Sequence, residues 1–404
     1  MPLALFALTI SAFAIGATEF VIVGLIPIIA EHLQITLPSA GLLVSLYAFG
    51  VAVGAPVLTA LTGKVPRKWL LMGLMALFTA GNLLAWQATS YLVLVIARVL
   101  TGLAHGVFFS IGSTIATSLV PKEKAASAIA IMFSGLTVAL VTGVPLGTWI
   151  GQTYGWQETF LAVSLLGVIA LLASLLFIPD DIHHAPPASL RQQLQVLTHP
   201  RLLLVYAKTA LGYGGAFTAF TFLAPILQNI SGFSAASVSV ILLVYGVSVA
   251  VSNIWGGKLA DRKGPLSALK LLFAGLAIVL MSLTFTAGNQ ITAVLTVLVW
   301  GAFAFGNVPG LQVLVVQQAQ RFTPNAVDVA SGLNIAAFNV GIALGSITGG
   351  AVVSHMTLMD TPWVGSLIVL IALGLTFASE RLERTDTNFS PNWDYTHSTG
   401  QTSP

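Results

Sequence analysis

The sequence predicts an all-α membrane protein with twelve transmembrane helices, arranged as two pseudo-symmetric six-helix bundles. Three observations lead to this prediction. The composition is too apolar for a water-soluble fold. Twelve segments have the length and apolar character of membrane-spanning helices. The second half of the chain repeats features of the first half at a constant offset of 198 residues.

The composition indicates that most of the protein surface faces lipid. Of the 404 residues, 56% are hydrophobic and only 7% are charged, and the mean hydropathy is +0.93. A soluble domain carries roughly 25% charged residues, so this chain could not cover its surface in water. The formal charge of +3 comes from residues at helix ends, which indicates membrane topology rather than nucleic-acid binding. The absence of cysteine excludes disulfides and thiolate metal sites.

Twelve apolar segments reach the roughly 20 residues that a spanning helix needs. They are rich in Gly, Ala and Ser, the small residues that let helices approach closely in a membrane. The first segment follows no basic region and is too long for a signal peptide, so we expect it to be retained. The predicted spans are residues 3–30, 39–61, 69–88, 91–119, 126–152, 157–178, 202–228, 234–257, 266–287, 291–316, 327–353 and 362–380.

The basic residues predict the orientation of these spans. Lysine and arginine follow the even-numbered spans, whereas the loops after the odd-numbered spans contain neither. By the positive-inside rule, both termini are expected in the cytoplasm, in a cell membrane of the bacterial inner-membrane type. The basic residues concerned are Lys64, Arg67, Lys68, Lys122, Lys124, Arg191, Arg201, Lys258, Arg262, Lys263, Lys270, Arg321, Arg381 and Arg384.

A polar stretch divides the chain into two sets of six spans. We predict an N-terminal bundle over residues 1–178, a cytoplasmic linker over 179–200 and a C-terminal bundle over 201–382. A disordered cytoplasmic tail over 383–404 follows. The linker holds a histidine pair at 183–184. No other ligand-spaced residues accompany the pair, so we interpret it as part of a solvated linker and predict no metal site.

The two halves repeat. Shifted by 198 residues, the first two spans overlay the seventh and eighth without a gap. A parallel repeat of six helices is typical of transporters whose halves rock around a site near the midplane. The identities are Ala12/Ala210, Gly16/Gly214, Leu25/Leu223, Pro27/Pro225, Ile28/Ile226, Ser39/Ser237, Tyr47/Tyr245, Val51/Val249, Ala52/Ala250, Val53/Val251 and Leu61/Leu259.

One short segment carries the most specific motif. "GKLADRKG", residues 257–264, resembles the signature of the major facilitator superfamily that joins the second to the third span and the eighth to the ninth. The resemblance implies the major facilitator fold and a cytoplasmic gate, which Asp261 would latch in the outward-facing state. An ordinary basic turn is the alternative. The first-half loop has Thr59 and Gly63 in place of the glycine and the acid, which weakens a latch there. The gate residues are Gly257, Asp261, Arg262 and Gly264.

Two further motifs point to one branch of this family. "LVIARVLTGLAHG", residues 94–106, is similar to the family's buried arginine followed by glycines. "TGVPLGTWIGQTYGW", residues 142–156, resembles the fifth-helix motif linked to export, but with P-x-G spacing instead of P-x-x-G-G. A close glycine-mediated helix contact is its alternative reading. With "TEFVIVGLIP", these segments look most like the drug:proton antiporter branch, and there like the sugar-efflux and arabinose-efflux permeases. The fifth-helix residues are Gly143, Pro145 and Gly147.

A single acidic residue lies inside the first predicted span. Glu19 stands in an otherwise uncharged stretch, and a charge at mid-bilayer costs roughly 2.5–3.5 kcal/mol even on a lenient scale. At about 1.5 Å per residue, its depth falls between those of Arg98 and His105 in the fourth span. We interpret these three residues as a proton-coupling cluster. The alternative is a structural pair of Glu19 with Arg98, in which His105 bonds backbone carbonyls.

Residues around this cluster are candidates for binding substrate. Helical spacing puts Arg98, His105 and Phe109 on one face of the fourth span, so we expect Glu19, His105 and Phe109 to contact substrate. In the C-terminal half, aromatic side chains with a few amides would suit a polyol, a nucleoside or an amphipathic drug. Lipid-facing phenylalanine is the alternative. Lys208 is expected to snorkel to the cytoplasmic surface. The C-terminal candidates are Phe217, Phe220, Asn307, Asn334, Phe338 and Asn339.

The sequence thus favours a proton-coupled exporter of small organic molecules that works by alternating access. Protons would be the coupling ion with no other cofactor, and the partners would be a small-molecule substrate and the lipid bilayer, with the protein acting as a monomer. Import by proton symport or uniport of a sugar or nucleoside is the alternative. A membrane receptor is disfavoured by the repeat and the gate motif. An intramembrane enzyme is disfavoured because no metalloprotease, nucleophile-elbow or phosphate-loop motif occurs.

Overall fold

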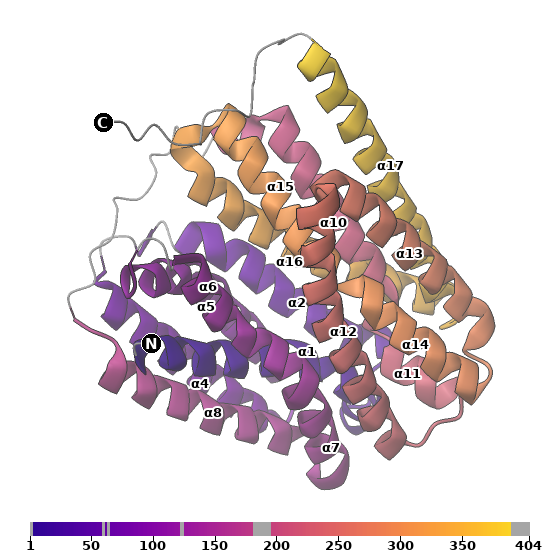
Figure 1. Ribbon diagram of the computed structural model, residues 1–404. Coiled ribbons are helices and arrows are strands. Elements are labelled where there is room, and N and C mark those ends of the chain that lie inside the picture. The colour runs from indigo at the N-terminus through magenta and orange to yellow at the C-terminus, as the bar shows by residue number, and fades with distance from the viewer. Residues whose placement is uncertain (1–2, 59–60, 63–64, 122–124, 181–194, 389–404) are drawn as a thin grey trace, which may run out of the picture.

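The computed structural model describes the chain except for residues 1–2, 59–60, 63–64, 122–124, 181–194 and 389–404. The described residues form an almost entirely helical protein (Figure 1). The histidine pair at 183–184, most of the predicted linker and most of the predicted tail lie outside them. The domain limits predicted from the sequence therefore stay a prediction.

The N-terminal half contains six spans, two of which include a π-helical turn. Its elements are α1 (Leu3–His32), α2 (Leu37–Val53) with the π-helical turn η1 (Gly54–Leu58), α4 (Arg67–Trp86), α5 (Tyr91–Ser118), α6 (Ala125–Val138) with the π-helical turn η3 (Ala139–Gly143) and α7 (Val144–Tyr154), and α8 (Trp156–Phe177).

The C-terminal half contains six more spans, two of which are broken near their middle. Its elements are α10 (Pro200–Phe220) continued by α11 (Leu223–Asn229), α12 (Ala235–Lys263), α13 (Pro265–Thr286), α14 (Gln290–Ala304) continued by α15 (Asn307–Phe322), the short η4 (Pro324–Ala326), α16 (Val327–His355) and α17 (Asp360–Asn388). Twelve helical segments among the described residues are long and apolar enough to cross a membrane, as predicted.

The sequence repeat has a structural counterpart in the helix caps. The Thr36 hydroxyl accepts a hydrogen bond from the backbone N–H of Ser39 and so caps α2, at 3.2 Å. The Ser234 hydroxyl accepts one from the N–H of Ser237 and caps α12, at 3.3 Å. Both members of the second pair are offset by 198 residues from the first. The second and eighth spans therefore start through the same local device.

Successive spans run in opposite directions, which gives the molecule two ends. We call one end the terminal face, because both described ends of the chain lie there. At this face Lys68 forms an ion pair with Asp180, with Nζ 3.1 Å from Oδ1. We call the other end the opposite face. There the Tyr91 hydroxyl donates to the Ser39 carbonyl oxygen at 2.7 Å, which ties α5 to α2.

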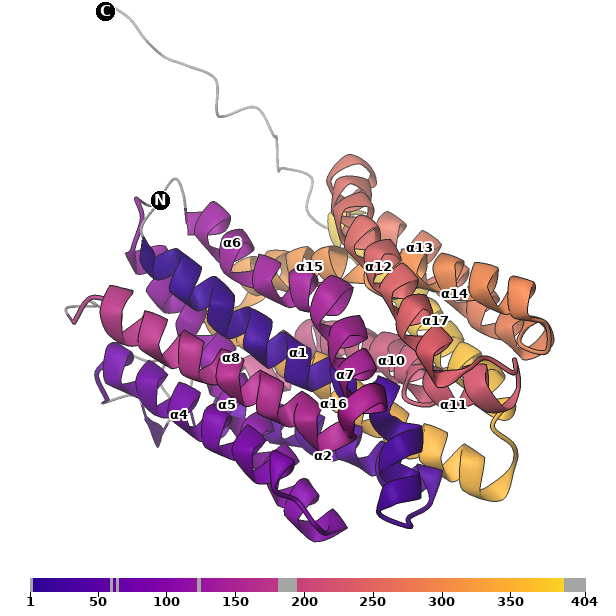
Figure 2. The ribbon, with the colours of Figure 1, turned by 90° about the horizontal axis from the view of Figure 1, so that it is seen from below.

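The two halves lie side by side (Figures 1 and 2), and α16 contacts both α2 and η1 of the second span. The Ser239 hydroxyl of α12 donates to the Gln152 side-chain oxygen of α7 at 3.0 Å. Pro38 of α2 packs against Gly350 of α16, and nearer the middle Gly246 of α12 meets η3. The packing between the halves therefore closes the opposite face.

The gate motif is mostly helical, which differs from the turn expected from the sequence. Gly257, Asp261 and Arg262 lie in the last turns of α12, which ends only at Lys263. Gly264 has φ of 79°, a value that favours glycine, and makes the turn into α13. Helix α12 continues beyond the apolar span, which was predicted to end at residue 257, because residues 258–263 contain no glycine or proline. Gly264 and the proline that follows it then end the helix.

Candidate functional site

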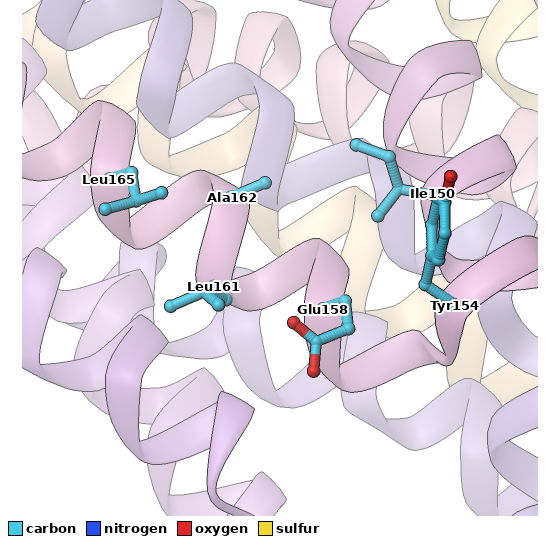
Figure 3. Close-up of a pocket in the computed structure, with 6 residues that line it drawn as sticks. All are labelled: Ile150, Tyr154, Glu158, Leu161, Ala162 and Leu165. Carbon is cyan, nitrogen blue, oxygen red and sulfur yellow. The ribbon is translucent and has the colours of Figure 1, made fainter.

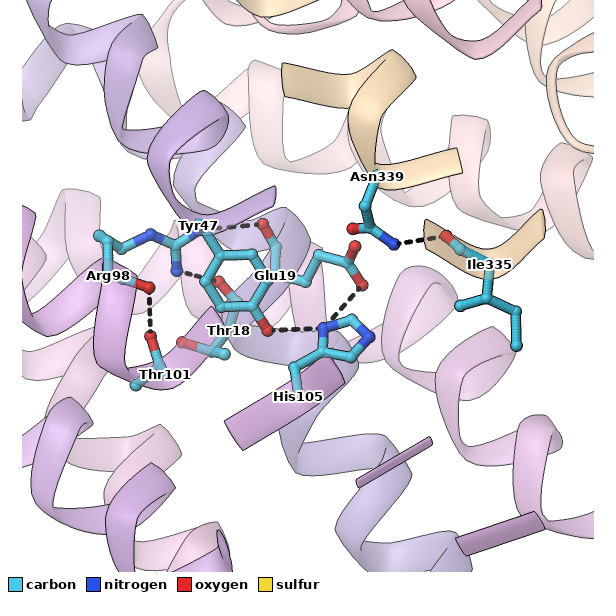
Figure 4. Close-up of polar contacts among 8 residues, drawn as sticks. All are labelled: Thr18, Glu19, Tyr47, Arg98, Thr101, His105, Ile335 and Asn339. Carbon is cyan, nitrogen blue, oxygen red and sulfur yellow. Dashed lines mark hydrogen bonds and ion pairs between the residues drawn. The ribbon is translucent and has the colours of Figure 1, made fainter. Parts of the chain in front are cut away.

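Glu19 lies in the middle of α1, where it faces the boundary between the two halves. Its side chain is 8% exposed. Figure 4 shows its carboxylate beside the imidazole of His105 on α5, with Oε2 3.9 Å from Nδ1. The amide of Asn339 on α16 faces the same carboxylate from the C-terminal half (Figure 4). A buried acid therefore sits where motion of one half against the other would change its surroundings.

Arg98 binds the backbone of two helices rather than the Glu19 carboxylate. Its side chain is 1% exposed and donates to three carbonyl oxygens. Nη1 lies 2.7 Å from the Thr18 oxygen, Nη2 3.5 Å from the Glu19 backbone oxygen and Nε 3.3 Å from the Leu43 oxygen. The structure thus brings Arg98 and Glu19 together, but the charged pair that the sequence offered as the alternative reading is not seen. Arg98 joins α1, α2 and α5.

Tyr47 of α2 connects Arg98 to His105 and was not identified as a site residue from the sequence. The guanidinium carbon of Arg98 lies 4.1 Å from the centre of the Tyr47 ring. The Tyr47 hydroxyl lies 2.9 Å from Nδ1 of His105. The ring of Phe109, one turn further along α5, is 4.9 Å from the His105 ring. The sequence contained one feature that singles out Tyr47, its identity with Tyr245 at the constant offset between the halves. That identity alone does not indicate a role for Tyr47.

Glycines bring α2 and α5 close enough for these contacts. A side chain at Gly102 would collide with the Tyr47 carbonyl oxygen, and one at Gly106 would collide with the Val51 carbonyl oxygen. The two glycines are four residues apart, so they lie on one face of α5 and let the two backbones touch. Arg98 and His105 then flank Tyr47 from the same helix.

Gly102→Ala should destabilise the protein, because its methyl group would have to push α2 away from α5. We expect a loss of about 1–3 kcal/mol, typical of overpacking, with weaker function at the cluster. Gly73→Ala is the control, since nothing lies within 4 Å of the position its methyl group would take. Thermal unfolding of both purified variants in detergent checks this. Equal stability of the two variants would contradict the close contact.

The predicted aromatic residues of the C-terminal half gather into one cluster beside Glu19. Tyr213 packs on Phe338 with ring centres 4.6 Å apart, and Phe217 packs on Phe220 at 5.2 Å. Phe20, the neighbour of Glu19 in α1, reaches across to Phe217 at 6.4 Å. Further members of the cluster are Tyr245, Trp300 and Phe305. All are buried, so they face protein rather than lipid.

The three predicted asparagines occupy different environments. Asn339 faces Glu19, and its side-chain oxygen is buried without a hydrogen-bond partner among the described residues. The Asn307 side-chain oxygen is in the same state, at the break between α14 and α15. Asn334 instead accepts from the Thr209 hydroxyl at 2.7 Å and donates to Gln312 at 3.0 Å. Asn334 therefore joins α10, α15 and α16. Asn307 and Asn339 each have a side-chain oxygen that accepts no hydrogen bond from the described residues.

Lys208 does not reach the membrane surface, so the expectation that it snorkels is wrong. Its side chain is fully buried, and Nζ donates to the Ser379 hydroxyl of α17 at 3.0 Å. The bundle interior supplies the partner that the sequence could not reveal. Nearby at the terminal face, Lys270 pairs with Glu380, with Nζ 2.9 Å from Oε2. Glu380 of α17 thus lies at the terminal-face end of the bundle, apart from the aromatic cluster.

The remaining motif residues lie away from the Glu19 cluster. Asp261 and Arg262 are exposed at the terminal face. Gly143 and Gly147 of the fifth span face α1, where side chains would meet Ala17 and Val21. This is the close helix contact considered as the alternative reading of that motif.

A groove of about 570 Å³ on the flank of the N-terminal half lies apart from the candidate site. Its walls belong to α7 and α8 near the opposite face, and Figure 3 shows Tyr154 and Glu158 among its lining side chains. The lining residues are Ile150, Tyr154, Glu158, Leu161, Ala162 and Leu165. The groove shares no residue with the cluster around Glu19.

Comparison with known sequences gives a match along most of the chain. Residues 8–346 match the family profile described as Major Facilitator Superfamily. YtbD of Bacillus subtilis, an MFS-type transporter, is 52% identical over 383 residues, which cover 95% of this chain and 96% of YtbD. YdhP of Escherichia coli, an inner membrane transport protein, is 42% identical over 380 residues, covering 93% and 96%. A chloramphenicol resistance protein of Streptomyces lividans is 35% identical over 383 residues, covering 93% and 96%.

A comparison of folds agrees. The crystal structure of a bacterial homolog to the human lysosomal transporter Spinster, in an inward-facing and unoccupied conformation, aligns with a TM-score of 0.77. The alignment covers 97% of this chain and 98% of that one, at 15% sequence identity. At this identity the likeness concerns the fold alone, and it confirms the predicted fold class.

Proposed function

Because the chain belongs to the major facilitator superfamily, we propose that it is a monomeric, proton-coupled exporter of small organic molecules. It works by alternating access, with protons as the coupling ion. The observation that carries this proposal is the buried Glu19 carboxylate at the boundary of the halves. Among the described residues, no arginine or lysine forms an ion pair with this carboxylate.

The proton coupling follows from the surroundings of Glu19. An ionised carboxylate in an apolar interior is costly, so burial favours its neutral, proton-bound form, whereas water or a nearby cation favours the ionised form. Rocking of the halves would move Asn339 and the aromatic cluster relative to α1 and change the access of water. Each conformation would then hold the proton with a different affinity, which links proton binding to the conformational equilibrium.

The conformation supports a direction for the open side. The halves pack together toward the opposite face, and Asp261 of the gate motif is exposed at the terminal face. With the terminal face in the cytoplasm, we interpret this arrangement as an inward-facing state in which Asp261 does not latch the gate. Substrate would then enter from the cytoplasm, as export requires.

The substrate class is supported by the aromatic cluster and by one relative. Phe217, Phe220 and Phe338 offer a buried apolar surface, and Asn307 and Asn339 each keep a free acceptor beside it. A flat, amphipathic molecule with a few hydrogen-bond donors fits such a site. Because the Streptomyces lividans relative is named a chloramphenicol resistance protein, we choose chloramphenicol as the first probe.

Proteoliposomes with an imposed pH gradient test the proposed function. Radiolabelled chloramphenicol and arabinose serve as probes, and counterflow is compared with accumulation. Export coupled to protons predicts that the pH gradient drives one probe against its concentration gradient, opposite to the movement of protons. Accumulation in the same direction as protons would establish symport, and counterflow that ignores the gradient would establish uniport.

The topology is tested by labelling. The protein contains no cysteine, so His183→Cys introduces a single reactive thiol in the predicted linker. Lys/Arg asymmetry predicts that this linker is cytoplasmic. In intact cells the thiol should react only with a membrane-permeant reagent. Ready labelling by an impermeant reagent would place the terminal face outside the cell and contradict the proposed direction.

A further inference from the structure

One nitrogen atom of the candidate site faces two possible partners. Nδ1 of His105 lies 2.9 Å from the Tyr47 hydroxyl and 3.9 Å from Oε2 of Glu19 (Figure 4). A ring nitrogen offers either one lone pair or one N–H, so it makes one good hydrogen bond at a time. At these distances the bond belongs to Tyr47, and Glu19 is left without it.

Tyr47 is held in place independently of His105. Its side chain is 1% exposed, and its ring lies against the Arg98 guanidinium at 4.1 Å. Its backbone is in contact with α5 at Gly102. The Tyr47 hydroxyl therefore stays beside Nδ1 of His105. Whether Glu19 can compete for this nitrogen depends on whether its carboxyl group carries a proton to donate.

We propose that Tyr47 is a positioning residue whose hydroxyl donates to Nδ1 of His105 and thereby keeps that nitrogen from accepting the proton of Glu19. The inference rests on the proposed function, because it assumes that Glu19 is the proton carrier. With Nδ1 occupied, the neutral imidazole carries its hydrogen on Nε2. The proton of Glu19 must then leave to water or be displaced by substrate, rather than be trapped between two neighbouring side chains.

Loss of the Tyr47 hydroxyl would expose the Nδ1 lone pair to the protonated Glu19. The carboxyl O–H could then donate to Nδ1, with the proton still on the carboxyl oxygen. The pair of Glu19 and His105 thereby gains one hydrogen bond in its proton-loaded form. The pair would therefore keep its proton to higher pH.

The other groups that face this pair come from three helices. Arg98 of α5 is engaged by backbone carbonyls, Tyr213 of α10 belongs to the aromatic cluster beside Glu19, and Asn339 of α16 faces the Glu19 carboxylate. The packed elements α6 and η3 contain no charged residue. Tyr47→Phe leaves these groups unchanged and keeps the ring against Arg98, so a change in titration would report on the hydroxyl.

The test is a titration of purified protein, read by the infrared carboxyl band that disappears in Glu19→Gln. Tyr47→Phe should raise the midpoint of this titration by about 0.5–1 pH unit, the effect of one added hydrogen bond. The pH midpoint of transport should rise with it. In a His105→Leu background, Tyr47→Phe should have no effect, because the nitrogen is absent. Tyr91→Phe, which removes another tyrosine hydroxyl bond between α2 and α5, should leave the midpoint unchanged.

Three results would overturn the inference: an unchanged midpoint in Tyr47→Phe, a lowered one, or a shift that persists without His105. If Tyr47→Phe does not fold, 3-fluorotyrosine at position 47 keeps the shape and strengthens the donor, so the midpoint should fall instead. The proposed function fails separately. If Glu19→Gln still drives uphill transport, Glu19 is not the carrier, whatever Tyr47→Phe does to the titration.

Discussion

Glu19→Gln is expected to retain substrate binding and counterflow but to lose accumulation driven by a pH gradient, by at least about tenfold. The amide mimics the protonated carboxyl in shape and charge, so the packing at the boundary of the halves should survive. It cannot release a proton, so the conformational cycle loses its link to the gradient. One pKa unit corresponds to about 1.4 kcal/mol, so even a modest difference in proton affinity between two conformations suffices for coupling.

The matched control is Glu31→Gln, which changes the same residue type on the same helix. Glu31 is exposed near the opposite face and lies outside the cluster. This variant should transport like the wild type in proteoliposomes at every pH. If Glu19→Gln also accumulates probe with the wild-type pH dependence, Glu19 is structural, and the proton carrier must be sought at His105.

Arg98→Met should cause the largest loss of stability of any single change at the site. The guanidinium is 1% exposed and bonds carbonyl oxygens of two other helices, and a hydrogen bond to a charged group contributes about 1.5–3 kcal/mol. The variant also loses the contact with the Tyr47 ring. We expect poor yield and a clearly lower unfolding temperature in detergent, whereas Arg262→Met, at an exposed arginine, should unfold like the wild type.

A double variant separates two roles for Arg98. If Arg98 served mainly as the counter-ion of the Glu19 carboxylate, Glu19→Gln would remove the unpaired charge left by Arg98→Met and restore stability. Since Arg98 bonds the backbone, the double variant should be as unstable as Arg98→Met alone. Restored stability would revive the structural pair considered from the sequence.

The sequence was sufficient for the architecture because its main features are one-dimensional. Span length and the constant offset between the halves can be read without any knowledge of contacts. The matching caps of α2 and α12, formed by Thr36 and Ser234, follow from that offset. The end of the helix in the gate segment could not be predicted from the sequence. Hydropathy falls at the membrane surface, whereas α12 continues as a helix to Lys263.

The site was predicted less completely, for a physical reason. Depth along two helices placed Glu19 between Arg98 and His105, but depth does not tell whether a guanidinium meets a carboxylate or a carbonyl of the same residue. The role of Tyr47 depends on how closely α2 and α5 pack at Gly102. Lys208 found its partner in Ser379, 171 positions away in the chain. Such choices depend on three-dimensional packing and leave no local pattern.

In the proposed cycle, the proton on Glu19 sets which face of the protein is open. Gln152 and Ser239, which bond across the halves at the opposite face, report this directly. Because the protein has no cysteine, the double variant Gln152→Cys with Ser239→Cys allows a spin label to be attached selectively at each of these two positions. The distance between the labels can then be measured without a known substrate.

The decisive measurement is the distance between these two labels as a function of pH, in otherwise wild-type protein and in Glu19→Gln. In the wild-type background, the populations of short and long distances should change with pH. In Glu19→Gln they should stay at the wild-type acidic limit at every pH. If the label distances in Glu19→Gln still change with pH as in the wild type, the proton on Glu19 does not set which face is open.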